Sequence, residues 1–131
     1  MATFLSRFAP PLALMALTFF LSAQPSLDSG LGDLDTVLRK GAHMTEFGLL
    51  WFLWWRALGY GHPGPAIAIA LGYAATDEWH QTFVSGRHGS PWDWAIDAAG
   101  VGLAGLLVVL AARRGIWRPP RERAATTSRA R

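Results

Sequence analysis

The 131-residue chain contains no cysteine, which excludes disulfide frameworks, zinc–thiolate and iron–sulfur sites, and cysteine nucleophiles. Charged residues are also scarce, at 16% compared with roughly 25% in a typical soluble domain. Apolar residues are abundant instead: 51% of the chain is hydrophobic and seven residues are tryptophan. So much apolar surface argues against a disordered chain, and the length suits one domain.

The positive charge is concentrated at one end of the chain. Residues 113–131 contain seven arginines and one glutamate, a net charge of +6; because the whole chain carries +3, residues 1–112 carry −3. Arginines directly after an apolar run are typical of a cytoplasmic juxtamembrane segment. These arginines continue through Pro119 and Pro120 into a Ser/Thr/Ala-rich end. We therefore expect a disordered cytoplasmic tail over 113–131 and no nucleic-acid partner.

Four apolar segments approach the roughly 20 residues that a membrane-spanning helix needs. They cover residues 8–23, 39–58, 63–84 and 92–112, although only 66–75 of the third is cleanly apolar. The first could also be a cleaved signal peptide, since Arg7 precedes it. Pro10 and Pro11 are expected in its first turn, where proline is tolerated. We predict an all-α integral membrane bundle of four transmembrane helices over residues 1–112.

The positive-inside rule gives the expected orientation. The arginine-rich tail places the C-terminus in the cytoplasm, and four spans then place the N-terminus there too. The Gly/Pro-rich link over 59–65, next to Arg56, is short enough to make its two segments antiparallel, and it also lies inside. The links over 24–38 and 85–91 then lie outside. The protein is expected to cross the membrane several times, with the lipid bilayer as its main partner.

Charged and polar side chains occur inside the apolar segments, where each charge costs about 2.5 to 3.5 kcal/mol at mid-bilayer. In the predicted topology they all fall near the outer face. The candidate site residues are Lys40, His43, Glu46, Asp77, Glu78, Gln81, Arg87, Asp93 and Asp97. We expect an outward-facing polar pocket. The alternative is a buried ion-pair network that only locks the helices together.

Helical spacing places several of these residues on shared faces. His43 and Glu46 are three apart, and Asp77 and Gln81 are four apart. Asp93 and Asp97 align with Gly100, whose small size allows a neighbouring helix to approach closely. His80 is expected to be a packed or interfacial residue, and His88 an ordinary loop residue.

The same residues form three motifs that resemble those of the VanZ-like family. The motifs are Lys40-x-x-His43-x-x-Glu46 with Phe47-Gly48-Leu49-Leu50, then Asp77-Glu78-x-x-Gln81 continuing through Gly86-Arg87 to Ser90 and Asp93, and finally Asp97-x-x-Gly100. The run from Phe20 to Pro25 is similar to the end of the family's first helix, which argues against signal cleavage. The resemblance covers about residues 8–112.

The resemblance implies a four-helix integral protein of the bacterial cytoplasmic (inner) membrane. The founding member of the family is associated with low-level resistance to the glycopeptide teicoplanin, which acts on cell-wall precursors outside the membrane. The resemblance does not cover the basic tail.

Three functions are compatible with the outward pocket. In the first, the pocket binds a lipid-linked cell-wall precursor or a glycopeptide-type molecule at the outer leaflet. Arg39, Lys40 and Arg87 would then hold phosphate or carboxylate groups, and Glu78, Asp93 and Gln81 would orient those bases.

The second is a membrane-embedded enzyme in which Glu46, Asp77 and Glu78 act as general acid and base. A metal-assisted variant would use His43, Glu46, Asp77, Glu78 and His80. We expect no cofactor or metal, because neither motif is a known closed ligand set. The third is a proton-coupled transporter, which would need a polar path through the inner half of the bundle. The sequence specifies no oligomeric state.

Overall fold

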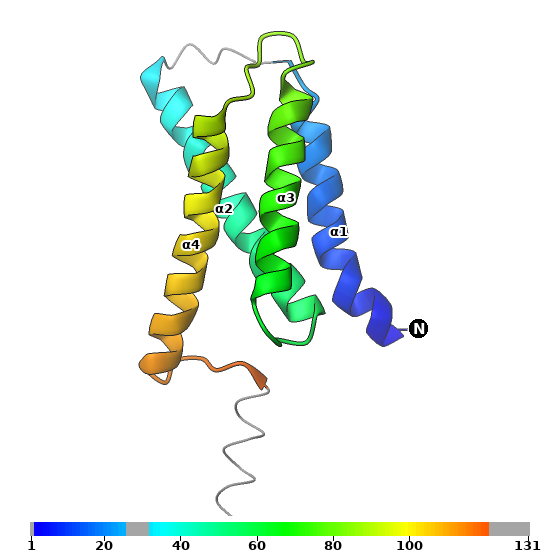
Figure 1. Ribbon diagram of the computed structural model, residues 1–131, viewed down its shortest axis with the longest axis vertical. Helices are drawn as coiled ribbons and strands as arrows, with labels where there is room; N and C mark the ends of the chain where they lie inside the picture. Colours follow the sequence, from blue (N-terminus) through cyan, green and yellow to red (C-terminus); the bar gives the residue numbers. More distant parts are fainter. Residues whose placement is uncertain (1, 26–31, 121–131) are drawn as a thin grey trace, which may run out of the picture.

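The computed structural model describes residues 2–25 and 32–120. It contains four helices, and no strand occurs in these two ranges: α1 (Ala2–Ser22), α2 (Asp33–Ala57), α3 (Gly64–Gln81) and α4 (Pro91–Arg113). The helices run alternately up and down, so the described chain begins and ends at the same end of the bundle (Figure 1). The predicted all-α class is confirmed.

The α2 helix begins earlier than the expected residue 39. Asp33 and Asp35 occupy its first turn, where negative side chains stabilise the exposed N–H groups. Asp35 also pairs with Arg39 one turn later. The outer link that we expected to extend to residue 38 is correspondingly shorter, and residues 26–31 of it lie outside the described part.

The prediction that Pro10 and Pro11 lie in a first helical turn is wrong, because α1 begins at Ala2 and both prolines lie in its interior. Proline has no N–H, so Pro10 leaves the carbonyl of Ser6 without its helical donor. Arg56 of α2 fills this position, with its Nη2 donating to the Ser6 oxygen at 3.3 Å. A side chain from a neighbouring helix thus compensates for part of the break.

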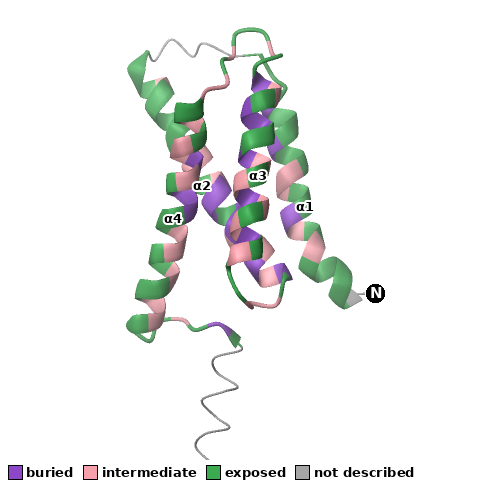
Figure 2. Cartoon of the chain, viewed as in Figure 1, coloured by how far each residue is buried: buried purple, intermediate pink, exposed green. Residues whose placement is uncertain are grey.

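The core lies along α2 and α3, whereas α1 and α4 are largely exposed (Figure 2). Fully buried Phe47 and Leu50 of α2 pack against small residues of α3, Ala70 and Ala74. The exposed surfaces of α1 and α4 carry large apolar side chains, among them Phe20 and Leu107. By length and composition, Thr3–Ser22 and Pro91–Arg113 are apolar enough to cross a membrane.

The helices α2 and α4 meet at two glycines. A Cβ atom on Gly100 would lie 2.2 Å from the main-chain oxygen of Met44, and one on Gly48 would lie 2.9 Å from that of Gly100. No larger side chain fits between these backbones without moving a helix. The close approach brings the start of α4 alongside the middle of α2.

An aromatic cluster closes the end of the bundle where the described chain ends. Trp117, after α4, lies with its ring centroid 5.7 Å from Tyr60 and 6.3 Å from Trp55. The first residues of the expected tail therefore pack against the bundle. Residues 121–131 of that tail lie outside the described part.

Candidate functional site

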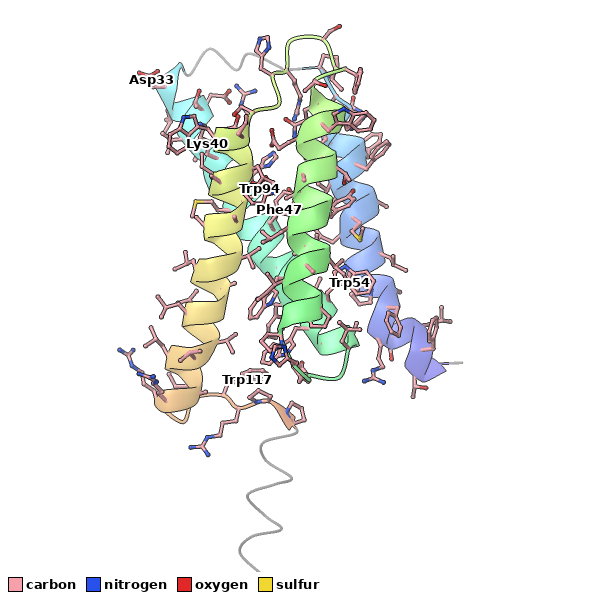
Figure 3. The ribbon with its side chains drawn as sticks, viewed as in Figure 1. Asp33, Lys40, Phe47, Trp54, Trp94 and Trp117 are labelled. Carbon is pink, nitrogen blue, oxygen red and sulfur yellow. The ribbon has the colours of Figure 1, made fainter. Side chains whose placement is uncertain are left out.

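A pocket of about 330 Å³ lies at the end of the bundle where α2 and α4 begin and α3 ends. Seven of the nine predicted site residues line it: Lys40, His43, Glu78, Gln81, Arg87, Asp93 and Asp97. The rest of the lining comprises Thr36, Arg39, Gly86, Ile96 and His88, which was expected only as a loop residue. Figure 3 shows Lys40 on α2 close to the start of α4.

The rim of the pocket is formed where α4 begins. Ser90 caps the helix, with its Oγ accepting from the N–H of Asp93 at 3.1 Å and donating to Asp93 Oδ2 at 2.8 Å. The other oxygen of Asp93 lies 3.1 Å from the Lys40 ammonium. Both side chains are about a third exposed or more, so the pair contributes about 1 kcal/mol or less to stability. Its main effect is to hold Lys40 over the pocket.

Glu78 joins the end of α3 to the loop that precedes α4. Its Oε2 accepts from the N–H of Ser90 at 3.0 Å, and the side chain is only 6% exposed. Gly89 passes so close to α3 that a Cβ there would lie 1.9 Å from the Glu78 main-chain oxygen. The loop thus shields the Glu78 carboxylate from solvent on one side.

His43 and Asp97 form the base of the pocket. The imidazole Nδ1 lies 3.3 Å from Asp97 Oδ1, and Asp97 is 1% exposed. The other oxygen of Asp97, Oδ2, has no hydrogen-bond partner among the described residues, and the same holds for Glu78 Oε1. Buried carboxylate oxygens without partners are costly, so the base of the pocket strongly favours a positive group.

Two predicted site residues lie beside the pocket instead of lining it. Glu46 accepts a hydrogen bond from Thr18 of α1, and Asp77 Oδ2 accepts from Ser22 Oγ at 2.9 Å and from Gln81 Nε2 at 2.8 Å. Sequence reasoning missed both hydroxyls. Their signal was available, since Thr18 and Ser22 are the only side-chain hydroxyls of residues 8–23 and are one helical turn apart.

Arg87 binds the end of α1. Its Nε donates to the oxygen of Gln24 at 3.0 Å and its Nη2 to that of Leu21 at 3.2 Å. Both carbonyls lie at the C-terminal end of α1, where a cation is favourable, and that of Leu21 also accepts from the N–H of Gln24 at 3.2 Å. The Arg87 guanidinium therefore has a structural role in addition to lining the pocket. Glu78 and Gln81, which were expected to orient the bases, contact Ser90 and Asp77 respectively.

His80 does not join the pocket lining. Its ring stacks on that of Phe19 of α1, with centroids 4.4 Å apart. The expectation of a packed histidine agrees with this contact.

The half of the bundle away from the pocket is apolar inside. In the described ranges, the buried polar side chains are Thr18, Ser22, Asp77, Glu78, Gln81 and Asp97, which all belong to the pocket or to its contacts with α1. The other half buries Trp51, Trp55, Ala66 and Ala70. Over the described residues, this interior shows no polar path of the kind that a proton-coupled transporter needs.

The model of the family described as VanZ/LLP1 matches residues 8–113. No curated protein and no solved structure matches.

Proposed function

We propose that this chain, which belongs to the VanZ/LLP1 family, crosses the bacterial cytoplasmic membrane four times and uses its pocket to bind a cell-envelope molecule at the outer leaflet. The family and the two apolar helices fit a membrane protein. The four spans, their orientation and the ligand are our inference.

The distribution of aromatic residues supports four spans. Trp79 at the end of α3 and Trp92 at the start of α4 are 67% and 79% exposed at the pocket end. Trp54 and Trp117 lie toward the opposite end (Figure 3). Tryptophan is enriched at both membrane interfaces, and the 18 residues of α3 extend about 27 Å, close to the hydrocarbon thickness.

The orientation follows from the arginines. Arg56, Arg113 and Arg114 lie near the end opposite the pocket. An excess of arginine marks the cytoplasmic side. The pocket would therefore open toward the outside.

Single-cysteine labelling should show this topology directly, because the native chain has no cysteine. We expect His88→Cys to react with a membrane-impermeant maleimide added to intact cells. His62→Cys, an exposed residue of the α2–α3 link, should react only after the membrane is opened. Labelling of His88→Cys only from the cytoplasmic side would overturn the outward pocket.

An amphipathic anionic molecule is the ligand that fits the pocket best. The observation that carries this proposal is the placement of Arg39, Lys40, Arg87 and His88 around a pocket at the aromatic, outer end of the bundle. Cationic side chains can bind phosphate or carboxylate groups of the headgroup, while its apolar chain stays in the lipid. Lipid-linked cell-wall precursors and glycopeptides have such groups.

Binding of a polyprenyl phosphate or of teicoplanin to the purified protein should depend on Lys40. We expect Lys40→Ala to weaken binding about tenfold, as expected for loss of a charge-assisted hydrogen bond of about 1.4 kcal/mol. Lys40 is a better choice than Arg87, which also holds α1. Arg113→Ala removes an equal charge at the opposite end and should bind like the wild type. Equal binding by all three proteins would contradict the proposal.

A membrane-embedded enzyme is the second candidate. It is favoured by the unpartnered carboxylate oxygens of Glu78 and Asp97 at the base of the pocket, because such groups are suited to moving protons. Release of phosphate from the bound lipid in the binding assay would favour this function over binding alone.

A further inference from the structure

We propose that His43, Glu78 and Asp97 bind one divalent metal cation at the base of the pocket. Each residue comes from a different helix, α2, α3 and α4, and one ligand atom of each lies within 4.8 Å of the others. This site goes beyond the proposed function and does not depend on which molecule the pocket binds.

The unpartnered oxygens supply an independent reason for a cation. Asp97 is 1% exposed and Glu78 is 6% exposed, and both line the pocket. Glu78 Oε1 and Asp97 Oδ2 have no hydrogen-bond partner among the described residues, and Asp97 Oδ1 faces the proposed ligand His43. A buried carboxylate is retained when it is paired or when it coordinates a metal.

Two of the cations that line the pocket have other partners. Lys40 pairs with Asp93, and Arg87 donates to main-chain oxygens of α1. The only ion-pair contact of Asp97 within the described part of the chain is His43. A divalent ion would balance the two carboxylates and use the neutral imidazole as its third ligand.

The donor set indicates the class of metal. One imidazole and two carboxylates suit Zn²⁺, Mn²⁺ or Fe²⁺ better than Mg²⁺ or Ca²⁺, which prefer oxygen ligands. Three protein ligands leave at least one coordination position for a water or a headgroup oxygen from the pocket.

This ligand set differs from the one that the sequence indicated. Glu46 and Asp77 bind hydroxyls of α1, and His80 stacks on Phe19. Asp97, which the sequence-based metal variant omitted, takes their place. The packed bundle brings together one ligand from each of three helices. The spacing of residues along a single helix could not indicate such a set.

Metal titration of the full-length protein in lipid nanodiscs, after removal of metal with a chelator, tests the site. We expect Zn²⁺ or Mn²⁺ to bind at one saturable site and to raise the thermal unfolding temperature, because a ligand that binds only the folded state stabilises it. Glu78→Gln and His43→Gln should each weaken binding at least tenfold and remove the temperature shift. Glu46→Gln is the matched control, since it neutralises a nearby acid that binds Thr18, and it should bind like the wild type.

Two results would overturn the site: absence of saturable binding to the folded wild-type protein, or equal loss in Glu46→Gln and Glu78→Gln. The wild-type titration decides the question even if a variant fails to fold. Loss of metal binding with intact polyprenyl phosphate binding would remove this inference and leave the proposed function. Metal binding would support this inference even if the His88→Cys variant were labelled only from the cytoplasm. That labelling result would overturn the proposed function alone.

Discussion

Gly100→Val is expected to lower the free energy of unfolding by about 3 kcal/mol, the upper end of the usual cost of overpacking. A Cβ at this position would lie 2.2 Å from the main-chain oxygen of Met44, and a backbone atom cannot rotate away as a side chain can. The helices α2 and α4 would have to separate. Unfolding in increasing SDS, followed by tryptophan fluorescence, measures the change.

Gly102→Ala provides the matched control on the same helix. A Cβ there meets nothing within 4 Å. In soluble helices, alanine is favoured over glycine by about 1 kcal/mol. We therefore expect this variant to be as stable as the wild type or more stable. Equal destabilisation by both substitutions would mean that α4 needs glycine for its own backbone conformation. The close contact between α2 and α4 would then not be the cause.

The second large effect is expected at the base of the pocket. His43→Leu should cost about 3 kcal/mol of stability, because it removes the one ion-pair partner that Asp97, a 1% exposed carboxylate, has among the described residues. Replacing both residues, His43→Leu with Asp97→Leu, should restore most of the loss, since no buried charge then remains. Thermal unfolding of the single and double variants with a chelator present measures the pair without any bound metal.

The pair of Lys40 and Asp93 provides the contrast. Both side chains are much more exposed than Asp97. Replacing Lys40 with leucine, and then Asp93 as well, should change the free energy of unfolding by less than about 1 kcal/mol at each replacement. A double His43/Asp97 variant that is no more stable than His43→Leu alone would mean that Asp97 serves a different stabilising contact.

Much of the site could be predicted because charges inside apolar segments are conspicuous. The spacing of His43 on α2 and of Asp93 and Asp97 on α4 gave the faces that line the pocket. The alignment of Asp97 with Gly100 also predicted a close helix contact, and the structure places Met44 of α2 there.

The contacts of α1 could not be predicted in this way. Thr18 and Ser22 carry no charge, and their partners Glu46 and Asp77 are 28 and 55 residues away in sequence. Only the packed bundle brings such groups together. The same is true of Arg56, which donates to the Ser6 carbonyl that Pro10 leaves without a helical donor.

The polar contacts of α1 also bear on how the protein is made. In the described bundle α1 contacts α2 and α3 but not α4, and it is synthesised first. In the proposed four-span topology, Thr18 and Ser22 therefore enter the bilayer before the acids that they bind. When Glu46 and then Asp77 follow, each reaches a hydroxyl donor already in place, and Arg87 completes the attachment last. In that topology, the order of the helices along the chain matches an order of assembly in which these two carboxylates need not wait in lipid for a partner.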